Sequence, residues 1–88
     1  MADILIIANP ASGKFKIRKP LLNKIMVLLQ EKADKVELAL TEYRGHGTYL
    51  AQNSSSHIII AAGGDGLVNE VAKGIVNTDK LFYVLPFG

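Results

Sequence analysis

The alternation of apolar and polar positions along the chain predicts four strands. Four short apolar runs are each stopped by polar residues or by Gly and Pro, as strands in compact domains are. These runs are residues 4–8, 36–40, 57–62 and 81–85. The first and third are almost continuously apolar, which favours strands buried on both faces of a parallel sheet, whereas 36–40 alternates at its start, as a half-buried or edge strand does.

Three segments between these strands carry the spacing of amphipathic helices. Pro20 suits the first turn of a helix, and apolar residues recur every three to four positions from there to Ala33. Residues 45–52 predict a weaker helix because the segment contains two glycines. Residues 67–76 place their apolar side chains on one stripe, with the polar residues on the other side. The polar residues are Asn69, Glu70 and Lys73, and Asn77 directly after the segment falls on the same side.

Strands that alternate with helices indicate an α/β fold, which we expect to be a three-layer α/β/α arrangement around a short parallel sheet. The chain has 88 residues, enough for one small domain with a single core. It stops at the end of an apolar strand, with no further helix to cover the sheet. We therefore expect residues 1–88 to be a partial, truncated α/β domain.

Composition narrows the class of protein. With 49% apolar and 20% charged residues the chain should fold rather than stay disordered. A formal net charge of +2 is too weak to indicate nucleic acid as a partner. There is no cysteine, so neither a disulfide nor a thiolate metal site is possible, and a cytoplasmic location is expected. No apolar run approaches the length that spans a bilayer, so any membrane contact should be peripheral.

Four polar or glycine-rich segments begin where the predicted strands end. In open parallel sheets, ligands bind outside the carboxyl ends of the strands, so these segments should meet at one edge. They are Asn9-Pro10-Ala11-Ser12-Gly13, Thr41-Glu42, Gly63-Gly64-Asp65-Gly66 and Leu85-Pro86-Phe87-Gly88.

The segment 63–66 has the composition of a phosphate-binding turn. Gly63, Gly64 and Gly66 lack a β-carbon, so the backbone can approach a ligand closely, and its amides precede a helix N-terminus. Asp65 in that position would repel phosphate unless Mg²⁺ lay between them, which indicates a nucleotide with Mg²⁺. The alternative is a plain strand-to-helix turn in which Asp65 caps the helix.

The other edge segments favour the nucleotide interpretation. Asn9 offers an amide, Ser12 and Thr41 offer hydroxyl groups, and Gly13 a further exposed N–H. The sequence contains no GxxxxGK[ST] phosphate loop, and no GxGxxG follows the first or third strand, so neither a P-loop enzyme nor a dinucleotide-binding dehydrogenase is supported.

Two of these motifs, Asn9-Pro10-Ala11-Ser12-Gly13 and the stretch Gly63-Gly64-Asp65-Gly66-Leu67-Val68-Asn69-Glu70-Val71, occur in the same order as in a known family. The whole chain resembles the diacylglycerol kinase catalytic domain, shared by sphingosine, ceramide and bacterial lipid kinases. The resemblance implies the N-terminal part of a diacylglycerol-kinase-like, NAD-kinase-like nucleotide-binding domain. It also implies phosphoryl transfer from Mg-ATP to a lipid hydroxyl, in phospholipid metabolism.

By the same resemblance, a set of residues from the edge segments should bind the ATP cofactor, with Asp65 near Mg²⁺ and the phosphates. The set is Asn9, Pro10, Ala11, Ser12, Gly13, Thr41, Gly63, Gly64, Asp65, Gly66, Leu67, Val68, Asn69 and Glu70. The segment 85–88 resembles the start of the family's LPxGT motif. The catalytic base of the family lies in a second, lipid-binding domain, so no catalytic residue is expected in this segment and the chain alone should be inactive.

Several alternatives stay open. Leu67 stands where the family usually has threonine, and this substitution also fits a catalytically inactive nucleotide-binding or interaction module. The GGDG turn is similar to that of NAD kinases and phosphofructokinases, so an NAD-kinase-like small-molecule kinase is a further alternative. Glu70 is either a nucleotide contact or a solvated or capping acid in the first helical turn. His46 is expected on a helix surface and His57 at a strand start.

Two surfaces suggest further contacts. The cations beside the first glycine loop could neutralise phosphates, touch anionic lipid headgroups or simply be solvated. They are Lys14, Lys16, Arg18 and Lys19. The exposed last strand predicts self-association.

Overall fold

The computed structural model describes residues 3–87, so Gly88, the last residue of the fourth edge segment, lies outside the described residues. The elements run β1 (Asp3–Ala8), α1 (Phe15–Gln30), β2 (Lys35–Leu40), α2 (His46–Gln52), β3 (Ile58–Gly63), α3 (Asp65–Gly74) and β4 (Leu81–Pro86). The strands form one parallel sheet in the order β2-β1-β3-β4. The predicted α/β class and the alternation of strands and helices are confirmed.

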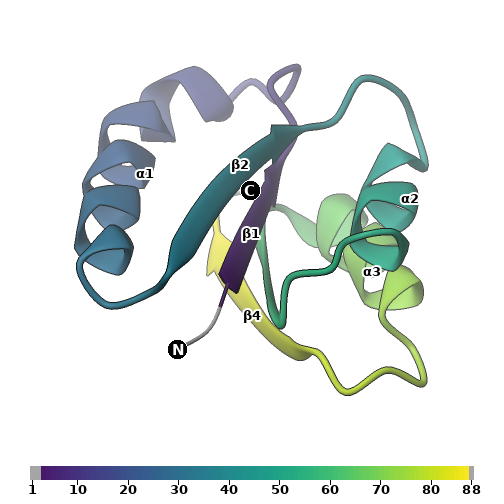
Figure 1. Ribbon diagram of the computed structural model, residues 1–88. Coiled ribbons are helices and arrows are strands. Elements are labelled where there is room, and N and C mark those ends of the chain that lie inside the picture. The colour runs from purple at the N-terminus through teal and green to yellow at the C-terminus, as the bar shows by residue number, and fades with distance from the viewer. Residues whose placement is uncertain (1–2, 88) are drawn as a thin grey trace.

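The sheet is covered on both faces, with α1 on one side and α2 and α3 on the other (Figure 1). On the α1 side, Ile4 and Ile6 of β1 pack with Ile60 of β3 and with Leu22 of α1. On the opposite side, Leu5 and Ile7 of β1 pack with residues of β3, α2 and α3. Burial on both faces explains why the run of β1 is continuously apolar.

The first helix begins earlier than the sequence indicated. Phe15, rather than Pro20, is its first residue, and Pro20 lies inside the helix. The N–H of Arg18 already donates to the carbonyl of Lys14 at 3.0 Å, so the helical turn exists before the proline. Pro20 is exposed. Proline leaves the carbonyl of Lys16, four residues earlier, without an intrahelical partner, and because Lys16 is also exposed, water can take that place.

The third helix also begins earlier, at Asp65 instead of Leu67, and ends at Gly74 instead of Val76. Gly64 is its N-cap residue, and no side chain caps the helix. Asp65 is therefore the first helical residue, and the alternative in which it caps the helix is wrong.

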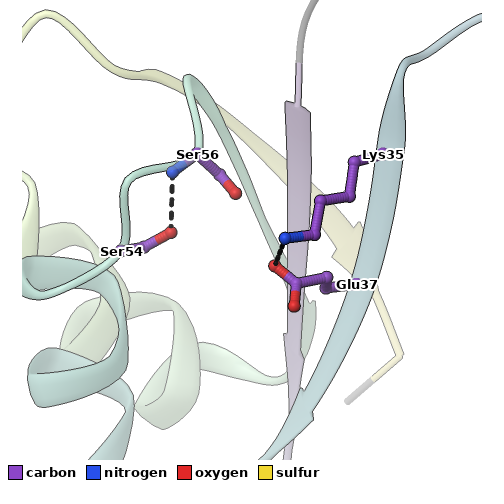
Figure 2. Close-up of polar contacts among 4 residues, drawn as sticks. All are labelled: Lys35, Glu37, Ser54 and Ser56. Atoms are coloured by element: carbon purple, nitrogen blue, oxygen red, sulfur yellow. Dashed lines mark hydrogen bonds and ion pairs between the residues drawn. The ribbon is translucent and has the colours of Figure 1, made fainter.

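Polar contacts stabilise the turn between α2 and β3, and one ion pair lies on the edge strand β2 (Figure 2). Ahead of β3, the Ser56 N–H donates to Ser54 Oγ at 3.0 Å, which shapes the turn between α2 and β3. The Lys80 ammonium then donates to the carbonyls of Ser54 and Ser56 at 2.6 and 3.1 Å, which ties this turn to the start of β4. On the edge strand β2, Lys35 Nζ lies 3.6 Å from Glu37 Oε1.

Candidate functional site

Two loops that are far apart in the sequence meet at the carboxyl edge of the sheet. The loop after β1 and the turn after β3 line a common cavity of about 320 Å³, the first edge cavity. Its lining residues are Asn9, Ser12, Phe15, Ala62, Gly63, Gly64, Gly66, Leu67 and Phe87. The adjacency of β1 and β3 produces this meeting, because Ala8 pairs with Ala62 where the two strands end.

The second edge cavity, of about 370 Å³, lies toward β2. It shares Asn9, Gly66 and Leu67 with the first cavity. Its lining residues are Asn9, Ala11, Thr41, Glu42, Tyr43, Arg44, Gly66, Leu67 and Glu70. Thr41 reaches this edge because its N–H continues the ladder between β1 and β2, donating to the Ala8 carbonyl at 2.9 Å.

The loop after β1 is held by its own side chains. Asn9 Oδ1 accepts the N–H of Ala11 at 2.9 Å, and Ser12 Oγ accepts the N–H of Lys14 at 3.4 Å. The backbone N–H of Ser12 donates to the Asn9 carbonyl at 3.2 Å. The carboxamide oxygen of Asn9 is thus used to shape the loop, and its amide nitrogen is the group that can donate to a ligand.

The turn after β3 presents backbone rather than side chains. An added β-carbon on Gly66 would meet nothing within 4 Å, so the backbone there borders open space shared by both edge cavities. Because no side chain caps α3, the N–H groups of its first turn are available at this rim. Open amides at a helix N-terminus suit an anionic ligand.

Asp65 occupies a different place from the other predicted site residues. It lines neither edge cavity but a third one of about 230 Å³, which the turn forms with Val84 and Pro86 of β4. Its side chain is exposed. Among residues 3–87, no group of three or more His, Cys, Asp or Glu side chains could hold a metal ion. A metal at Asp65 would therefore depend on oxygen atoms from a ligand and from water.

Leu67 lies between the two edge cavities and lines both. Its side chain fills the space beside two glycines: an added β-carbon would lie 2.8 Å from Leu67 Cδ2 at Gly63 and 3.1 Å from Leu67 Cδ1 at Gly47. Leu67 thus packs α3 against both the end of β3 and the start of α2. These contacts lie on the face of the sheet that α2 and α3 cover, where Val71 is also buried.

Glu70 is not a solvated acid. Its Oε1 accepts the N–H of Gly47 at 3.2 Å, and its backbone carbonyl accepts the Thr48 hydroxyl at 2.7 Å. Glu70 therefore caps the first turn of α2 from a neighbouring helix, while also lining the second edge cavity. The sequence pattern suggested a capping acid, but for its own helix.

His46 is also not a surface residue, because only 8% of it is exposed. Its Nδ1 accepts the N–H of Glu42 at 3.0 Å, so the neutral ring carries its proton on Nε2. The ring stacks on Tyr43 with centroids 4.4 Å apart. This contact braces the segment after β2 that lines the second edge cavity. Gly45, at φ +92°, provides the left-handed turn that starts α2.

The remaining predicted site residues lie around the two edge cavities without lining them. Val68 packs toward the sheet and borders the third cavity. Pro10, Gly13 and Asn69 are exposed and line none of the three cavities. Tyr43 and Arg44 were missed by the sequence analysis, although both directly follow the predicted segment at Thr41-Glu42, and the strand-end rule extended by two residues would have found them.

Comparison with known proteins agrees with this arrangement. The sequence profile described as the diacylglycerol kinase catalytic domain matches residues 3–88. The chain belongs to the diacylglycerol kinase catalytic domain family. The resemblance read from the two glycine motifs is thereby confirmed.

Individual relatives of the family share between 27% and 38% of their aligned residues with the chain. A diacylglycerol kinase of Staphylococcus haemolyticus is 38% identical over 94% of the chain, and a sphingoid long chain base kinase of Saccharomyces cerevisiae is 33% identical over 83% of it. A crystal structure of a diacylglycerol kinase from Bacillus anthracis superposes with a TM-score of 0.80 at 27% identity, over 97% of the chain.

The chain spans only part of these relatives. It covers 26% of the Staphylococcus enzyme, 11% of the yeast enzyme and 32% of the Bacillus structure. None of the helices within residues 3–87 has both the length and the apolar character that crossing a membrane requires.

Proposed function

We propose that this chain is the nucleotide-binding part of an ATP-dependent lipid kinase, which transfers a phosphoryl group from Mg-ATP to a lipid hydroxyl. One observation carries the proposal: the loop after β1 and the turn after β3 line one cavity, and both segments carry hydrogen-bond donors that a nucleotide could use. The family to which the chain belongs supports the same reaction class, since its members are named as diacylglycerol and sphingoid base kinases.

The residues at the edge fit the polyphosphate of a nucleotide. The uncapped amides at the start of α3 would bind phosphate oxygens, with the amide nitrogen of Asn9 and the hydroxyl of Ser12 donating from the opposite loop. Gly66 would allow the phosphates to approach the backbone, since a β-carbon there would occupy the open space. These groups would orient the terminal phosphate, and positioning is a large part of what an enzyme contributes to phosphoryl transfer.

A magnesium ion fits only together with the nucleotide. Asp65 is the carboxylate within the turn itself, whereas Glu70 lies further along α3, where its Oε1 accepts the N–H of Gly47. Mg²⁺ is commonly held by one or two carboxylates, phosphate oxygens and water, which is the set Asp65 and a triphosphate would supply. When bound, Mg-ATP supplies the phosphoryl group and neutralises its developing charge.

The other parts of the proposal concern the longer reaction. We place the base that accepts the proton of the lipid hydroxyl, and the lobe that binds the lipid, outside residues 1–88. The chain alone should therefore bind nucleotide without phosphorylating lipid, in a cytoplasmic protein with peripheral membrane contact. Lipid phosphorylation by the purified 88-residue chain would contradict this division of roles.

Titration calorimetry with Mg-ATP tests the proposal directly. We expect weak, saturable binding that is lost in Asp65→Ala and retained in the matched variant Asp79→Ala. Asp79 is an exposed residue just before β4, at the opposite end of the strands from the edge cavities. Equal affinities of the wild type and Asp65→Ala would remove Asp65 from the site.

Leu67 specifically favours a second candidate, a catalytically inactive nucleotide-binding or interaction module. The side chain fills the space beside Gly63 and Gly47 with apolar atoms, where a shorter threonine would offer a hydroxyl group to the edge cavities. If the chain binds no nucleotide at all, the same titration gives no heat, and the interaction module is the better description. Transfer of phosphate to NAD rather than to lipid, in a longer form of the protein, would favour an NAD-kinase-like enzyme.

Self-association through β4 completes the proposal. Leu81 and Tyr83 are 45% and 56% exposed, and β4 is an edge strand. Their register partners, Ile58 and Ile60, pack on the α1 side of the sheet, so the two side chains belong to the same face. Light scattering that shows only monomer at high protein concentration would contradict self-association.

A further inference from the structure

His46 is a buried titratable residue that the proposed reaction does not use. Among residues 3–87 the buried polar residues are Thr41, His46 and Ser56, and the first two lie close together in the sequence at the carboxyl edge of the sheet. A buried imidazole loses its hydrogen bonds to water, so protein groups must replace them. For His46 the replacing group belongs to residues 41–44, which line the second edge cavity and are called the lining segment below.

His46 holds the lining segment through both its side chain and its backbone. Nδ1 accepts the N–H of Glu42 at 3.0 Å, and the backbone N–H of His46 donates to the Tyr43 carbonyl at 3.1 Å. The imidazole stacks on the ring of Tyr43, with 4.4 Å between the centroids and 16° between the planes. Gly45, at φ +92°, makes the left-handed turn that brings His46 back toward the segment.

The lining segment has few other contacts. Residues 42–44 are exposed, and within residues 3–87 their side chains form no other hydrogen bond or ion pair. Thr41 is held by the sheet, since its N–H donates to the Ala8 carbonyl at 2.9 Å. Beyond Thr41, the conformation of the segment therefore depends on His46.

The imidazole serves this segment rather than the helix on which it lies. The hydrogen bond of Nδ1 runs back to Glu42, whereas the Gly47 N–H in the first turn of α2 has its own acceptor in Glu70 Oε1. A residue that acted only as a helix cap would accept an N–H of its own helix. The contact of His46 thus fixes one wall of the second edge cavity, in the connection from β2 to α2 (Figure 1).

We propose that His46 is a positioning residue of the nucleotide site. Its neutral imidazole supplies a fixed acceptor for the Glu42 N–H, and this contact keeps the lining segment in the conformation that a nucleotide meets in the second edge cavity. Without the acceptor, residues 42–44 would have to become ordered when the nucleotide binds, which lowers affinity. The inference rests on the proposed function, because it concerns Mg-ATP bound at this edge.

Two substitutions separate the acceptor from the ring. His46→Asn keeps an acceptor oxygen close to the position of Nδ1 but removes the ring, whereas His46→Phe keeps a ring that can stack on Tyr43 but removes the acceptor. In titration calorimetry with Mg-ATP, His46→Phe should bind about tenfold more weakly than the wild type, as expected if one further residue must be ordered. His46→Asn should stay within about threefold of the wild type.

Two controls exclude a merely structural effect. His57→Phe makes the same substitution at an exposed residue just before β3, at the opposite end of the strands, and should leave the affinity unchanged. Lys80→Met removes the contacts that tie the turn before β3 to the start of β4, so it should lower the stability of the fold without lowering the affinity of the folded protein. Circular dichroism at the temperature of the titrations should show that every variant is folded.

Wild-type affinity in His46→Phe, or equal losses in His46→Phe and His46→Asn, would overturn the proposal while leaving nucleotide binding intact. Absence of Mg-ATP binding by the wild type would instead overturn the proposed function and this inference together.

A measurement on the wild type does not depend on the folding of any variant. Long-range proton–nitrogen NMR spectra of the complex with Mg-ATP should show the proton of the His46 ring on Nε2. A proton on Nδ1 in that complex would exclude Nδ1 as an acceptor and would overturn the proposal.

Discussion

Replacing Gly66 by alanine should separate the stability of the fold from its ability to bind nucleotide. Gly66 is the second residue of α3, and an added β-carbon meets no atom within 4 Å. Alanine should therefore fit without strain, and its higher helix propensity should stabilise the fold by about 0.5 kcal/mol. For a chain of this size, that corresponds to a rise in Tm of roughly 2–4 °C.

The same methyl group would enter the space that both edge cavities share. A phosphate held by the amides of the α3 turn would be pushed away from the backbone, and a hydrogen bond to a charged group contributes about 1.5–3 kcal/mol. The affinity for Mg-ATP should therefore fall roughly 10- to 150-fold. Differential scanning fluorimetry and titration calorimetry on the same preparation measure the two effects.

Gly74→Ala is the matched control, because it makes the same substitution in the same helix. There the new β-carbon would lie 2.5 Å from the Thr48 carbonyl oxygen and 2.8 Å from the Ala51 β-carbon. Overpacking of this kind costs about 1–3 kcal/mol, so Tm should fall while the affinity of the folded protein stays close to that of the wild type. Wild-type affinity in Gly66→Ala would refute the reasoning, as would a variant that loses affinity and stability together.

Three further substitutions test individual contacts. Glu70→Ala should lower the free energy of unfolding by about 0.5–2 kcal/mol in urea denaturation, because the Gly47 N–H at the start of α2 loses its acceptor. Glu70→Gln keeps an acceptor oxygen and should lose less stability, and equal losses in the two variants would exclude a capping role. Leu67→Thr should raise the affinity for Mg-ATP in calorimetry while costing about 1–2 kcal/mol of stability through lost apolar contact, and an unchanged affinity would show that a hydroxyl there reaches no phosphate. Lys80→Met should lower the free energy of unfolding by about 2 kcal/mol in the same denaturation assay, since the carbonyls of Ser54 and Ser56 lose a charged donor. The control Lys73→Met, at an exposed site, should change it little. Similar losses in the two variants would contradict a stabilising role of Lys80.

The sheet was predictable because its central strands are buried on both faces, which leaves continuous apolar runs in the sequence. The start of α1 was not predictable in the same way. Residues 14–19 are mostly basic, and the preference of proline for a first helical turn outweighed the single apolar anchor at Phe15, which packs on the core beside Leu22. Tertiary packing decided the boundary, as it often does for a helix with weak local signals.

The candidate site was predictable to the extent that it consists of strand ends. The rule that parallel strands end at one edge predicted that Asn9, Thr41 and the glycine turn lie together. Asn9, Thr41 and the three glycines of that turn border the edge cavities, whereas Asp65 borders the third cavity. His46 was assigned to a helix surface, and for Glu70 a nucleotide contact and a solvated or capping acid both stayed open, because the partners of these residues lie on another element or on a turn. The periodicity of a helix shows on which side of that helix a residue lies. It does not show whether a backbone N–H of a neighbouring segment is close enough to donate a hydrogen bond to the side chain.

The central position of β1 has a consequence for biosynthesis. Of the four strands, the first to be synthesised has neighbours on both edges, and its second neighbour, β3, ends at Gly63, about sixty residues after the start of β1. Until β3 has been synthesised, the apolar residues 4–7 of β1 lack one of their two neighbouring strands. Exposed apolar segments of this kind bind chaperones and promote aggregation. The pairing of β1 on both of its edges should therefore be complete only once β3 has been synthesised.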